Sequence, residues 1–513
     1  MNDTHRVARR SGMALALTIL AFGTASAEAK TTDVTAYVLT GPTLDSKTVT
    51  INGNSIDPST VESVRASIAR VFSSSYPDGR IVREVTAGNV DLAIDYSAPG
   101  VAVPDVYYGV NVQIASKEFL AMPLYRELVR HLRIDIARFP AGQERVLYDR
   151  YASTDSPWKL GERGEYEFLL TGKDVENFVS LCRENGIKAE WQLNLANDDP
   201  AMWARMADQV VNGLKYPIEY FSVGNEPDIS PTGNWKYLGA KTRDEAIEEY
   251  AVRYLRYRSA LRAIAPNASF VLGELSCNRE PDLSAILGRM LDRARADPPE
   301  ALSAHWYLLG DWGEPKSHPE YPSIEHLSVD GNRGNNVRRL QAIRDSLKAA
   351  SDARAPGARI FVGEWGASWS ATPGGIDVLD TLATALYTAE TLEYGKTVGV
   401  DSMEYFSLSD PASFSPWNSA MIAMDGEKAT LRPQYYVRAM HRYAWGNRTI
   451  PVPGGQTGDL SVYASRGGDA KYLMLINRTA KPIDRVIAAK SESAEKRYLI
   501  RAIPYSMTIA VLP

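Results

Sequence analysis

Residues 219–228 read Glu-Tyr-Phe-Ser-Val-Gly-Asn-Glu-Pro-Asp, a short apolar segment that ends abruptly in polar residues. A short apolar run that is bounded by turn residues is typical of a buried strand. Pro227 fixes the turn that follows the strand, and a region of helical spacing begins at Asp244. A buried strand followed by a helix is the repeating unit of a parallel α/β sheet.

The same unit recurs along the middle of the chain. Eight strands are expected at residues 107–114, 132–139, 188–194, 219–225, 269–274, 302–306, 359–364 and 401–406. Helical spacing is found at residues 117–131, 173–185, 202–214, 244–264, 283–296, 335–350, 377–394 and 433–443. Eight alternating units are the number that closes a (β/α)8 barrel, so the sequence predicts an α/β fold of this type, a TIM barrel.

Both ends of the chain differ from this pattern. Residues 32–103 hold β-like segments around one expected helix at 60–72. After Trp445 the helices stop, and strands are expected at 460–464, 471–476, 484–488 and 507–511. A tail of 68 residues (446–513) makes a poor independent domain. We therefore expect residues 28–106 and 446–513 to form one accessory β-sandwich beside the barrel at 107–445.

The N-terminus has the features of an export signal. Arg6, Arg9 and Arg10 precede an apolar stretch at 13–22, and Ala25-Ser26-Ala27 then forms a small-x-small cleavage pattern. A membrane anchor is the alternative, but the apolar stretch is far shorter than the roughly 20 residues that span a bilayer. The sequence thus predicts a signal peptide at 1–27 and a secreted or periplasmic protein, with no membrane attachment after cleavage.

Composition excludes several classes of protein. Hydrophobic residues make up 44% and charged residues 23% of the 513 residues, which is ordinary for a globular chain and excludes disordered, collagen-like and coiled-coil proteins. Lys and Arg number 57 against 62 Asp and Glu, so no basic field exists to hold nucleic acid. Cys182 and Cys277 are the two cysteines; unpaired thiols are favoured over a disulfide, and no C-x-x-C or H-E-x-x-H motif indicates a metal or redox centre.

Groups that are costly to bury stand at four of the expected strand ends. Arg138 ends the second strand, Glu226 follows the fourth, His305 and Tyr307 end the sixth, and Glu364 ends the seventh. In (β/α)8 barrels the active site is built at this carboxyl end, so Glu226 and Glu364 should converge although 138 residues separate them.

A pair of carboxylates is what glycosidic bond cleavage requires. One must be protonated to donate to the departing oxygen, and the other must be ionised to attack or stabilise the sugar cation. The charge of the second carboxylate helps to keep the first one protonated. Glu274 also ends a strand, but it has no Asn or Trp neighbour and is interpreted as a supporting or structural group. Taken alone, His305 would more typically be a buried histidine whose ring nitrogens have hydrogen-bond partners. Arg138 alone would more typically form a structural ion pair.

Three motifs together resemble glycoside hydrolase clan A. They are Val223-Gly224-Asn225-Glu226-Pro227-Asp228, Ser303-Ala304-His305-Trp306-Tyr307 and Phe361-Val362-Gly363-Glu364-Trp365-Gly366. The likeness covers about residues 107–445, and together with the β segments at both ends it looks most like families 79, 39 and 51. One departure is Tyr405-Phe406, which stands where an indole often forms the sugar platform.

The resemblance implies a retaining O-glycosyl hydrolase that works by double displacement. Glu226 would be the acid/base and Glu364 the nucleophile, oriented by Arg138 and Tyr307. Asn225 would bind the sugar 2-hydroxyl, and His305 and Trp365 are further expected substrate-binding residues. No cofactor and no metal are implied, and the partner would be a glycoside, oligosaccharide or polysaccharide.

Two alternatives share these motifs. A transglycosylase would use the same site and pass the glycosyl group to a sugar instead of water. A secreted carbohydrate-binding protein could keep the barrel without turnover, although a pure binder needs no pair of glutamates. The motifs indicate the reaction and not the sugar, the linkage or the oligomeric state.

Overall fold

The computed structural model describes residues 34–513 except 74, 78–80, 143–144, 151–157, 161–165, 197, 230–234, 236, 277–282, 311–316, 318–320, 329, 370–377, 414–418, 457 and 493. The expected signal peptide at 1–27 and Cys277 lie outside this range, and Cys182 is a buried free thiol. Among the helices described, none is both long and apolar enough to cross a bilayer.

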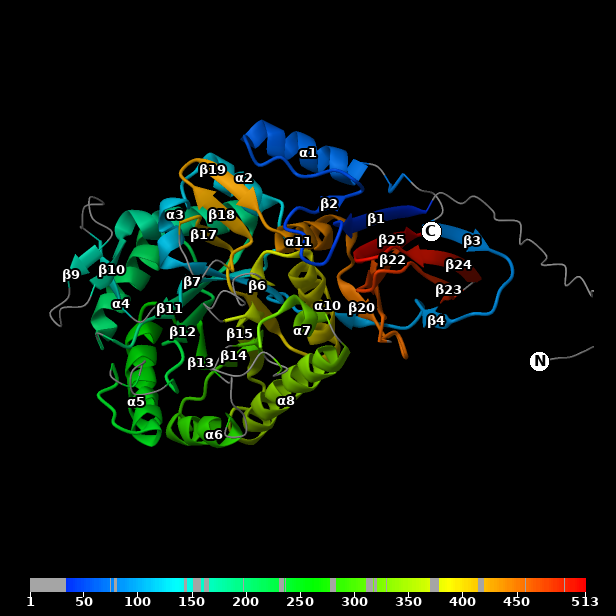
Figure 1. Cartoon of the computed structure of the whole chain (residues 1–513). Coiled ribbons are helices and arrows are strands. Elements are labelled where there is room, and N and C mark those ends of the chain that lie inside the picture. Colours follow the sequence, from blue (N-terminus) through cyan, green and yellow to red (C-terminus); the bar gives the residue numbers. More distant parts are fainter. Residues whose placement is uncertain are drawn as a thin grey trace, which may run out of the picture.

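A closed barrel of parallel strands forms the centre of the molecule (Figure 1). Its order is β11-β12-β13-β14-β15-β16-β6-β7, and every neighbouring pair is parallel. The strands are β6 (Tyr108–Gln113), β7 (Ile136–Ala141), β11 (Lys188–Leu193), β12 (Tyr220–Val223), β13 (Ser269–Leu275), β14 (Ala301–Leu309), β15 (Arg359–Ser368) and β16 (Ser402–Tyr405). Each overlaps one of the eight expected strands, which confirms the predicted barrel.

Helices surround the barrel and follow its strands in sequence. They are α2 (Pro123–Arg130), α3 (Gly172–Asn185), α4 (Pro200–Asp208), α5 (Arg243–Arg262), α6 (Leu283–Arg293), α7 (Ile324–Ser328), α8 (Asp330–Arg354), α10 (Leu382–Val398) and α11 (Pro433–Ala444). Helices α3 and α5 begin with capping boxes, in which Thr171 and Thr242 accept a hydrogen bond from the backbone N–H three residues ahead.

Two expected helices are interrupted. The segment 117–131 consists of a 3-10 turn, η1 (Ile114–Glu118), and α2, because Pro123 lacks a backbone N–H and begins a new helix. The segment 202–214 ends as a π-helical turn, η2 (Gln209–Gly213), where the side chain of Gln209 donates to the carbonyl oxygen of Gly172 at 2.8 Å.

The two ends of the chain form the predicted β-sandwich. One sheet has the order β2-β1-β25-β22-β21-β20-β5 and the other β3-β24-β23-β4. Val38 and Leu473 of the first sheet share a core with Ile94 and Tyr498 of the second. The strands are β1 (Thr35–Thr40), β2 (Thr50–Ile51), β3 (Val82–Val85), β4 (Leu92–Asp95), β5 (Val101–Ala102), β20 (Arg448–Ile450), β21 (Leu460–Gly467), β22 (Ala470–Asn477), β23 (Ile483–Lys490), β24 (Glu495–Ala502) and β25 (Ser506–Leu512).

Two strands of the sandwich have no counterpart in the sequence prediction, β20 and β24. Strand β24 carries Lys496, Arg497 and Arg501 among its apolar residues, and this charge hides the alternation that identifies a strand. Its pairing with β23 and β3 stabilises it in the fold.

Shorter elements complete the molecule. Helix α1 (Val61–Ser73) lies against α2, where Arg65 forms an ion pair with Glu127 at 2.8 Å. Buried Glu390 of α10 accepts hydrogen bonds from Ser461 at 2.6 Å and Arg478 at 2.5 Å, and so ties the barrel to the sandwich. The small sheets β8-β10-β9 and β17-β18-β19 contain β8 (Val146–Asp149), β9 (Trp158–Leu160), β10 (Tyr166–Thr171), β17 (Ser409–Pro411), β18 (Ile422–Asp425) and β19 (Lys428–Leu431).

Candidate active site

The predicted strand ends meet at one end of the barrel. Glu364 lies on β15 and is paired in register with His305 on the neighbouring strand β14. Glu226 follows β12, and its backbone N–H donates to the carbonyl oxygen of Glu274 at 2.8 Å. The turn before Glu226 requires glycine, because Gly224 has φ +81° and a Cβ there would lie 2.5 Å from Leu195.

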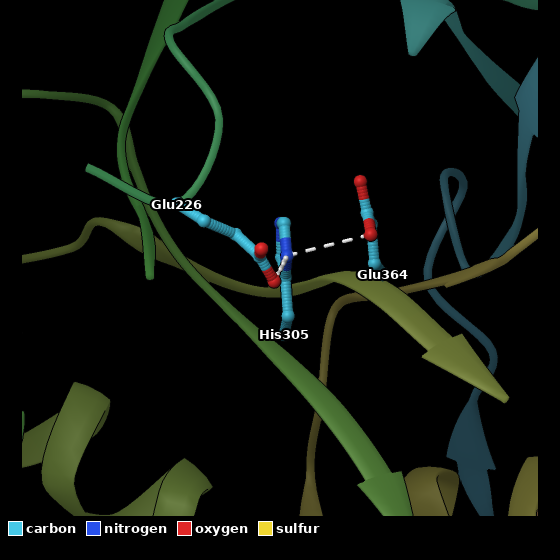
Figure 2. A group of neighbouring side chains, drawn as sticks. All are labelled: Glu226, His305 and Glu364. Carbon is cyan, nitrogen blue, oxygen red and sulfur yellow. Dashed lines mark hydrogen bonds and ion pairs between the residues drawn. The ribbon is translucent and has the colours of Figure 1, made fainter. Parts of the chain in front are cut away.

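Glu226 and Glu364 form a close carboxylate pair (Figure 2). One oxygen of each lies within 4.8 Å of the other and of a ring nitrogen of His305. The Glu226 side chain retains 16% exposure and that of Glu364 retains 7%. Two carboxylates at this spacing can act on opposite sides of one small group between them.

Glu364 is held at both oxygens. Arg138 donates to Oε1 at 2.8 Å, and the Tyr307 hydroxyl donates to Oε2 at 3.0 Å. Burial raises the pKa of Glu364, while the charges of His305 and Arg138 oppose that rise. Burial also raises the pKa of Tyr307 well above its ordinary value, so the hydroxyl keeps the proton that it donates. The two hydrogen bonds keep the carboxylate in one orientation.

His305 bridges two glutamates and has no exposed surface. Its Nδ1 lies 3.0 Å from Glu226 and 3.5 Å from Glu364, and its Nε2 lies 2.9 Å from Glu274. Burial acts to lower the pKa of His305, but these three carboxylates outweigh it and raise the pKa to about 10. The imidazolium therefore donates from both nitrogens. His305 is an expected substrate-binding residue, and in the structure both of its ring nitrogens face carboxylates.

Arg138 is fully buried and links several groups beneath the pair. Besides Glu364 it reaches Asn225 Oδ1 at 3.0 Å, Asn111 Oδ1 at 3.0 Å and Glu274 at 3.0 Å. The bond to Asn225 turns the amide oxygen toward Arg138, so a sugar contact by Asn225 would come from the amide nitrogen.

Trp365 does not face the site. The residue is 0% exposed and packs edge-on against Tyr405, with ring centroids 5.1 Å apart. Adjacent residues of a strand point to opposite faces, so the inward direction of Glu364 sends Trp365 outward toward the helices. The expected sugar contact of Trp365 is therefore replaced by a packing role.

Other tryptophans of the chain could also stack on a sugar ring. Trp312 and Trp417 lie outside the described residues, as does the side chain of Trp158, whereas Trp235 and Trp369 are half-buried. At the end of β16, the Phe406 ring lies so near Gly142 that a Cβ on Gly142 would be 3.1 Å from it and 4.0 Å from Glu364. Phe406 thus lies near Glu364, in addition to Tyr307.

Sequence reasoning missed several groups inside the barrel. Asn111 donates to the carbonyl oxygens of Gly363 at 2.8 Å and Glu404 at 3.0 Å, and the only signal for it is an Asn within an apolar strand. Glu190 and Glu404 are fully buried as well. Burial raises the pKa of Glu190 to about 7 and that of Glu404 well above its ordinary value, so the interior retains protons near neutral pH.

The described part of the chain holds one cluster with metal-ligand spacing, and it is this site: Glu226, His305 and Glu364. A metal would need a lone pair on a ring nitrogen of His305, but Nδ1 and Nε2 each face a carboxylate oxygen, at 3.0 Å and 2.9 Å. The donor set therefore fits a charge-balanced acid/base site better than a metal centre.

Comparisons with known proteins agree with this fold. No protein-family model matches the chain, and no curated protein is similar to it in sequence. Solved structures do match: a GH51 arabinofuranosidase from Xanthomonas axonopodis pv. citri has 16% identity and a TM-score of 0.61, with 83% of this chain and 100% of that chain covered. A 4-O-alpha-L-rhamnosyl-beta-D-glucuronidase from Fusarium oxysporum 12S has 11% identity and a TM-score of 0.61, with 82% and 100% covered.

A GH family 44 xyloglucanase from Paenibacillus polymyxa has 12% identity and a TM-score of 0.56, with 82% and 99% covered. These structures are clan A glycoside hydrolases, so the expected likeness to that clan is confirmed for the fold. At this level of identity, the likeness concerns the barrel and its accessory β domain.

Proposed function

We propose that the protein is a retaining glycoside hydrolase, with Glu226 as acid/base and Glu364 as nucleophile. The observation that carries the proposal is the spacing of the two carboxylates, which have oxygens within 4.8 Å of each other at the carboxyl end of the barrel. Retaining enzymes hold their carboxyl groups about 5–5.5 Å apart, whereas inverting enzymes leave about 6.5–9.5 Å for a water molecule.

In the first step, a Glu364 oxygen forms a bond to the anomeric carbon as the glycosidic C–O bond breaks. The carboxylic acid of Glu226 gives its proton to the departing oxygen, which leaves as an alcohol. Arg138 and Tyr307 orient Glu364 for this attack through their hydrogen bonds at 2.8 Å and 3.0 Å. The product of the step is a glycosyl ester on Glu364.

In the second step, water replaces the alcohol. The Glu226 carboxylate removes a proton from water, the water oxygen bonds to the anomeric carbon, and Glu364 leaves as a carboxylate. Two inversions at the same carbon give net retention. The sequence of steps uses side chains alone and needs no cofactor.

Replacement of each glutamate by alanine tests both the reaction and the assignment of roles. Either change should lower turnover of an unactivated glycoside by about 10²–10⁴-fold. In Glu364→Ala, azide can enter on the nucleophile side of an activated aryl glycoside, and NMR should identify an inverted glycosyl azide. In Glu226→Ala, azide should relieve deglycosylation and give the retained product. The opposite configurations would exchange the roles, and near-normal activity of both variants would refute the site.

The substrate is sought with a panel of aryl glycosides. Arabinofuranosides, glucuronides and glucosides belong in it, because the names of the similar structures include an arabinofuranosidase, a glucuronidase and a xyloglucanase. A second series with an added acceptor sugar distinguishes the alternatives: transfer products would indicate a transglycosylase, and binding without turnover would indicate a carbohydrate-binding protein.

We also propose that the protein is exported and acts outside the cytoplasm. Arg6, Arg9, Arg10 and the Ala25-Ser26-Ala27 pattern support this location. N-terminal sequencing of the exported protein should begin at Glu28. An exported pool that keeps Met1 would instead indicate a membrane anchor.

A further inference from the structure

We propose that Glu274 is a positioning residue for the acid/base carboxylate: through His305 it holds Glu226 in place and balances its charge in both steps. This inference rests on the proposed function and deepens it, since it concerns how the same site keeps Glu226 able to give and take a proton. Glu274 was interpreted from the sequence as a supporting or structural group.

Glu274 stands at the inner end of a continuous chain of contacts that leads to both glutamates of the pair. Its Oε2 accepts from His305 Nε2 at 2.9 Å and lies 3.0 Å from Arg138 Nη2. His305 Nδ1 lies 3.0 Å from Glu226, and Arg138 Nη1 donates to Glu364 at 2.8 Å. A single oxygen of Glu274 thus links the cations that contact the two glutamates.

Glu274 itself has no route to a substrate. The side chain is 0% exposed, and it lies directly against the backbone of β15. A Cβ on Gly363 would lie 2.5 Å from Glu274 Oε2, so the absence of a side chain at Gly363 makes room for this carboxylate. Glu274 therefore acts through His305 and Arg138 and not on the sugar.

The charges around His305 explain why Glu274 matters. The groups that face the ring are Glu226 after β12, Glu274 on β13 and Glu364 on β15. The groups that face Glu274 are Arg138 and Ser303, with Glu190 and Glu404 further inside the barrel.

Burial acts to raise the pKa of Glu274, but Arg138 and His305 outweigh it and the pKa falls below its ordinary value. Glu274 is therefore a permanent negative charge beneath the imidazolium. Because that charge stays when Glu226 takes up its proton, His305 keeps both N–H groups while Glu226 alternates between acid and carboxylate. Without the charge of Glu274, His305 Nε2 would lose its carboxylate partner. The ring would then no longer hold its Nδ1–H in a fixed position toward Glu226.

The isosteric change Glu274→Gln tests this role. It removes the charge and keeps the shape, so we expect the His305 titration to move to lower pH by one unit or more, as followed by NMR of the ring nitrogens. Acid assistance should also weaken. The kcat/KM of a glycoside with a poor leaving group, such as a methyl glycoside, should fall about 10²-fold, whereas that of the 2,4-dinitrophenyl glycoside should fall less than tenfold.

Glu393→Gln is the matched control. Glu393 is also buried and also lies 2.9 Å from a histidine Nε2, that of His441, but it belongs to α10 and not to the barrel mouth. This variant should change both substrates equally and leave the His305 titration in place. Equal losses on both substrates in Glu274→Gln, or an unmoved His305 titration, would overturn the proposal.

The wild-type protein provides a test that requires no variant. His305 should keep two N–H protons at pH 8, and a neutral ring at that pH would overturn the inference even if Glu274→Gln failed to fold. This measurement is independent of turnover. If no aryl glycoside is hydrolysed, the proposed function fails, while the His305 titration still decides the role of Glu274.

Discussion

Two buried histidines in this molecule lie beside glutamates at the same distance and differ in the direction of their pKa shifts. His305 Nε2 is 2.9 Å from Glu274 at the barrel mouth, and His441 Nε2 is 2.9 Å from Glu393 between α10 and α11. Both rings are 0% exposed. Burial acts to lower the pKa of each, yet that of His305 rises to about 10 and that of His441 falls below its ordinary value.

The difference comes from what else each glutamate contacts. Glu393 is already paired with Lys396 at 2.6 Å, and although burial acts to raise its pKa, Lys396 and His441 bring it down to about 2. Burial lowers the pKa of His441 and the Lys396 charge lowers it further, so the opposing effect of Glu393 does not reverse the shift. His305 instead faces three carboxylates, and two of them, Glu274 and Glu364, also contact Arg138. The charge balance around an imidazole, and not its depth, therefore determines whether it is protonated.

The largest expected difference between the two regions is in turnover. His305→Asn should lower kcat/KM on a poor leaving group by about 10²-fold, because Glu226 loses its donor. His441→Asn should leave kcat/KM within about twofold and lower the free energy of unfolding by about 1–3 kcal/mol, because it breaks only the packing network. Steady-state kinetics and urea unfolding of both variants measure these effects. Equal losses of kcat/KM in the two variants would show that the surroundings of His305 and of His441 do not differ in their effect on catalysis.

A smaller effect on kcat should distinguish residues that face the barrel interior from residues that face the surrounding helices. Tyr307→Phe removes a hydrogen bond that orients Glu364 for attack and should lower kcat about tenfold, at the lower end of the roughly 1.5–3 kcal/mol of a hydrogen bond to a charged group. Trp365→Phe alters an outward-facing core residue and should leave kcat and KM within about twofold while it destabilises the fold. A rise in KM for Trp365→Phe would instead support the expectation from the sequence that Trp365 contacts the sugar.

The smallest expected effect is a change in stability with pH. The folded pKa of His305 lies near 10, above its ordinary value of 6.5, so its protonation stabilises the fold fully below about pH 6.5 and this stabilisation is lost as the pH rises toward 10. The difference in melting temperature between wild type and His305→Asn should therefore shrink from pH 7 to pH 10. The folded pKa of His441 is lowered, so the corresponding difference for His441→Asn should change on the acid side of pH 6.5 instead. Thermal melts across this range test both signs.

Much of the fold and of the site followed from local patterns. Eight strand–helix units predicted the barrel, and β segments at both ends predicted the sandwich. Such predictions are possible because an element with one buried face carries its apolar residues at a regular spacing. The carboxyl ends of parallel strands converge, so Glu226, Glu364, Arg138 and Tyr307 could be placed together without knowledge of any contact. Trp365 was instead expected to bind substrate, although its place beside an inward Glu364 implies an outward direction.

Other features depended on partners far away in the chain. Strand β24 shows a weak pattern and is stabilised by pairing with β3, more than 400 residues before it. The position of Glu274 beneath His305 depends on the register of β13 and β14 and on the absence of a side chain at Gly363. The sequence by itself therefore determined which residues reach the barrel mouth, because periodicity and strand direction are local properties. Only the tertiary structure decided which of them are charged and which of them touch, because hydrogen bonds and pKa values depend on distances of a few ångströms between residues that the sequence keeps apart.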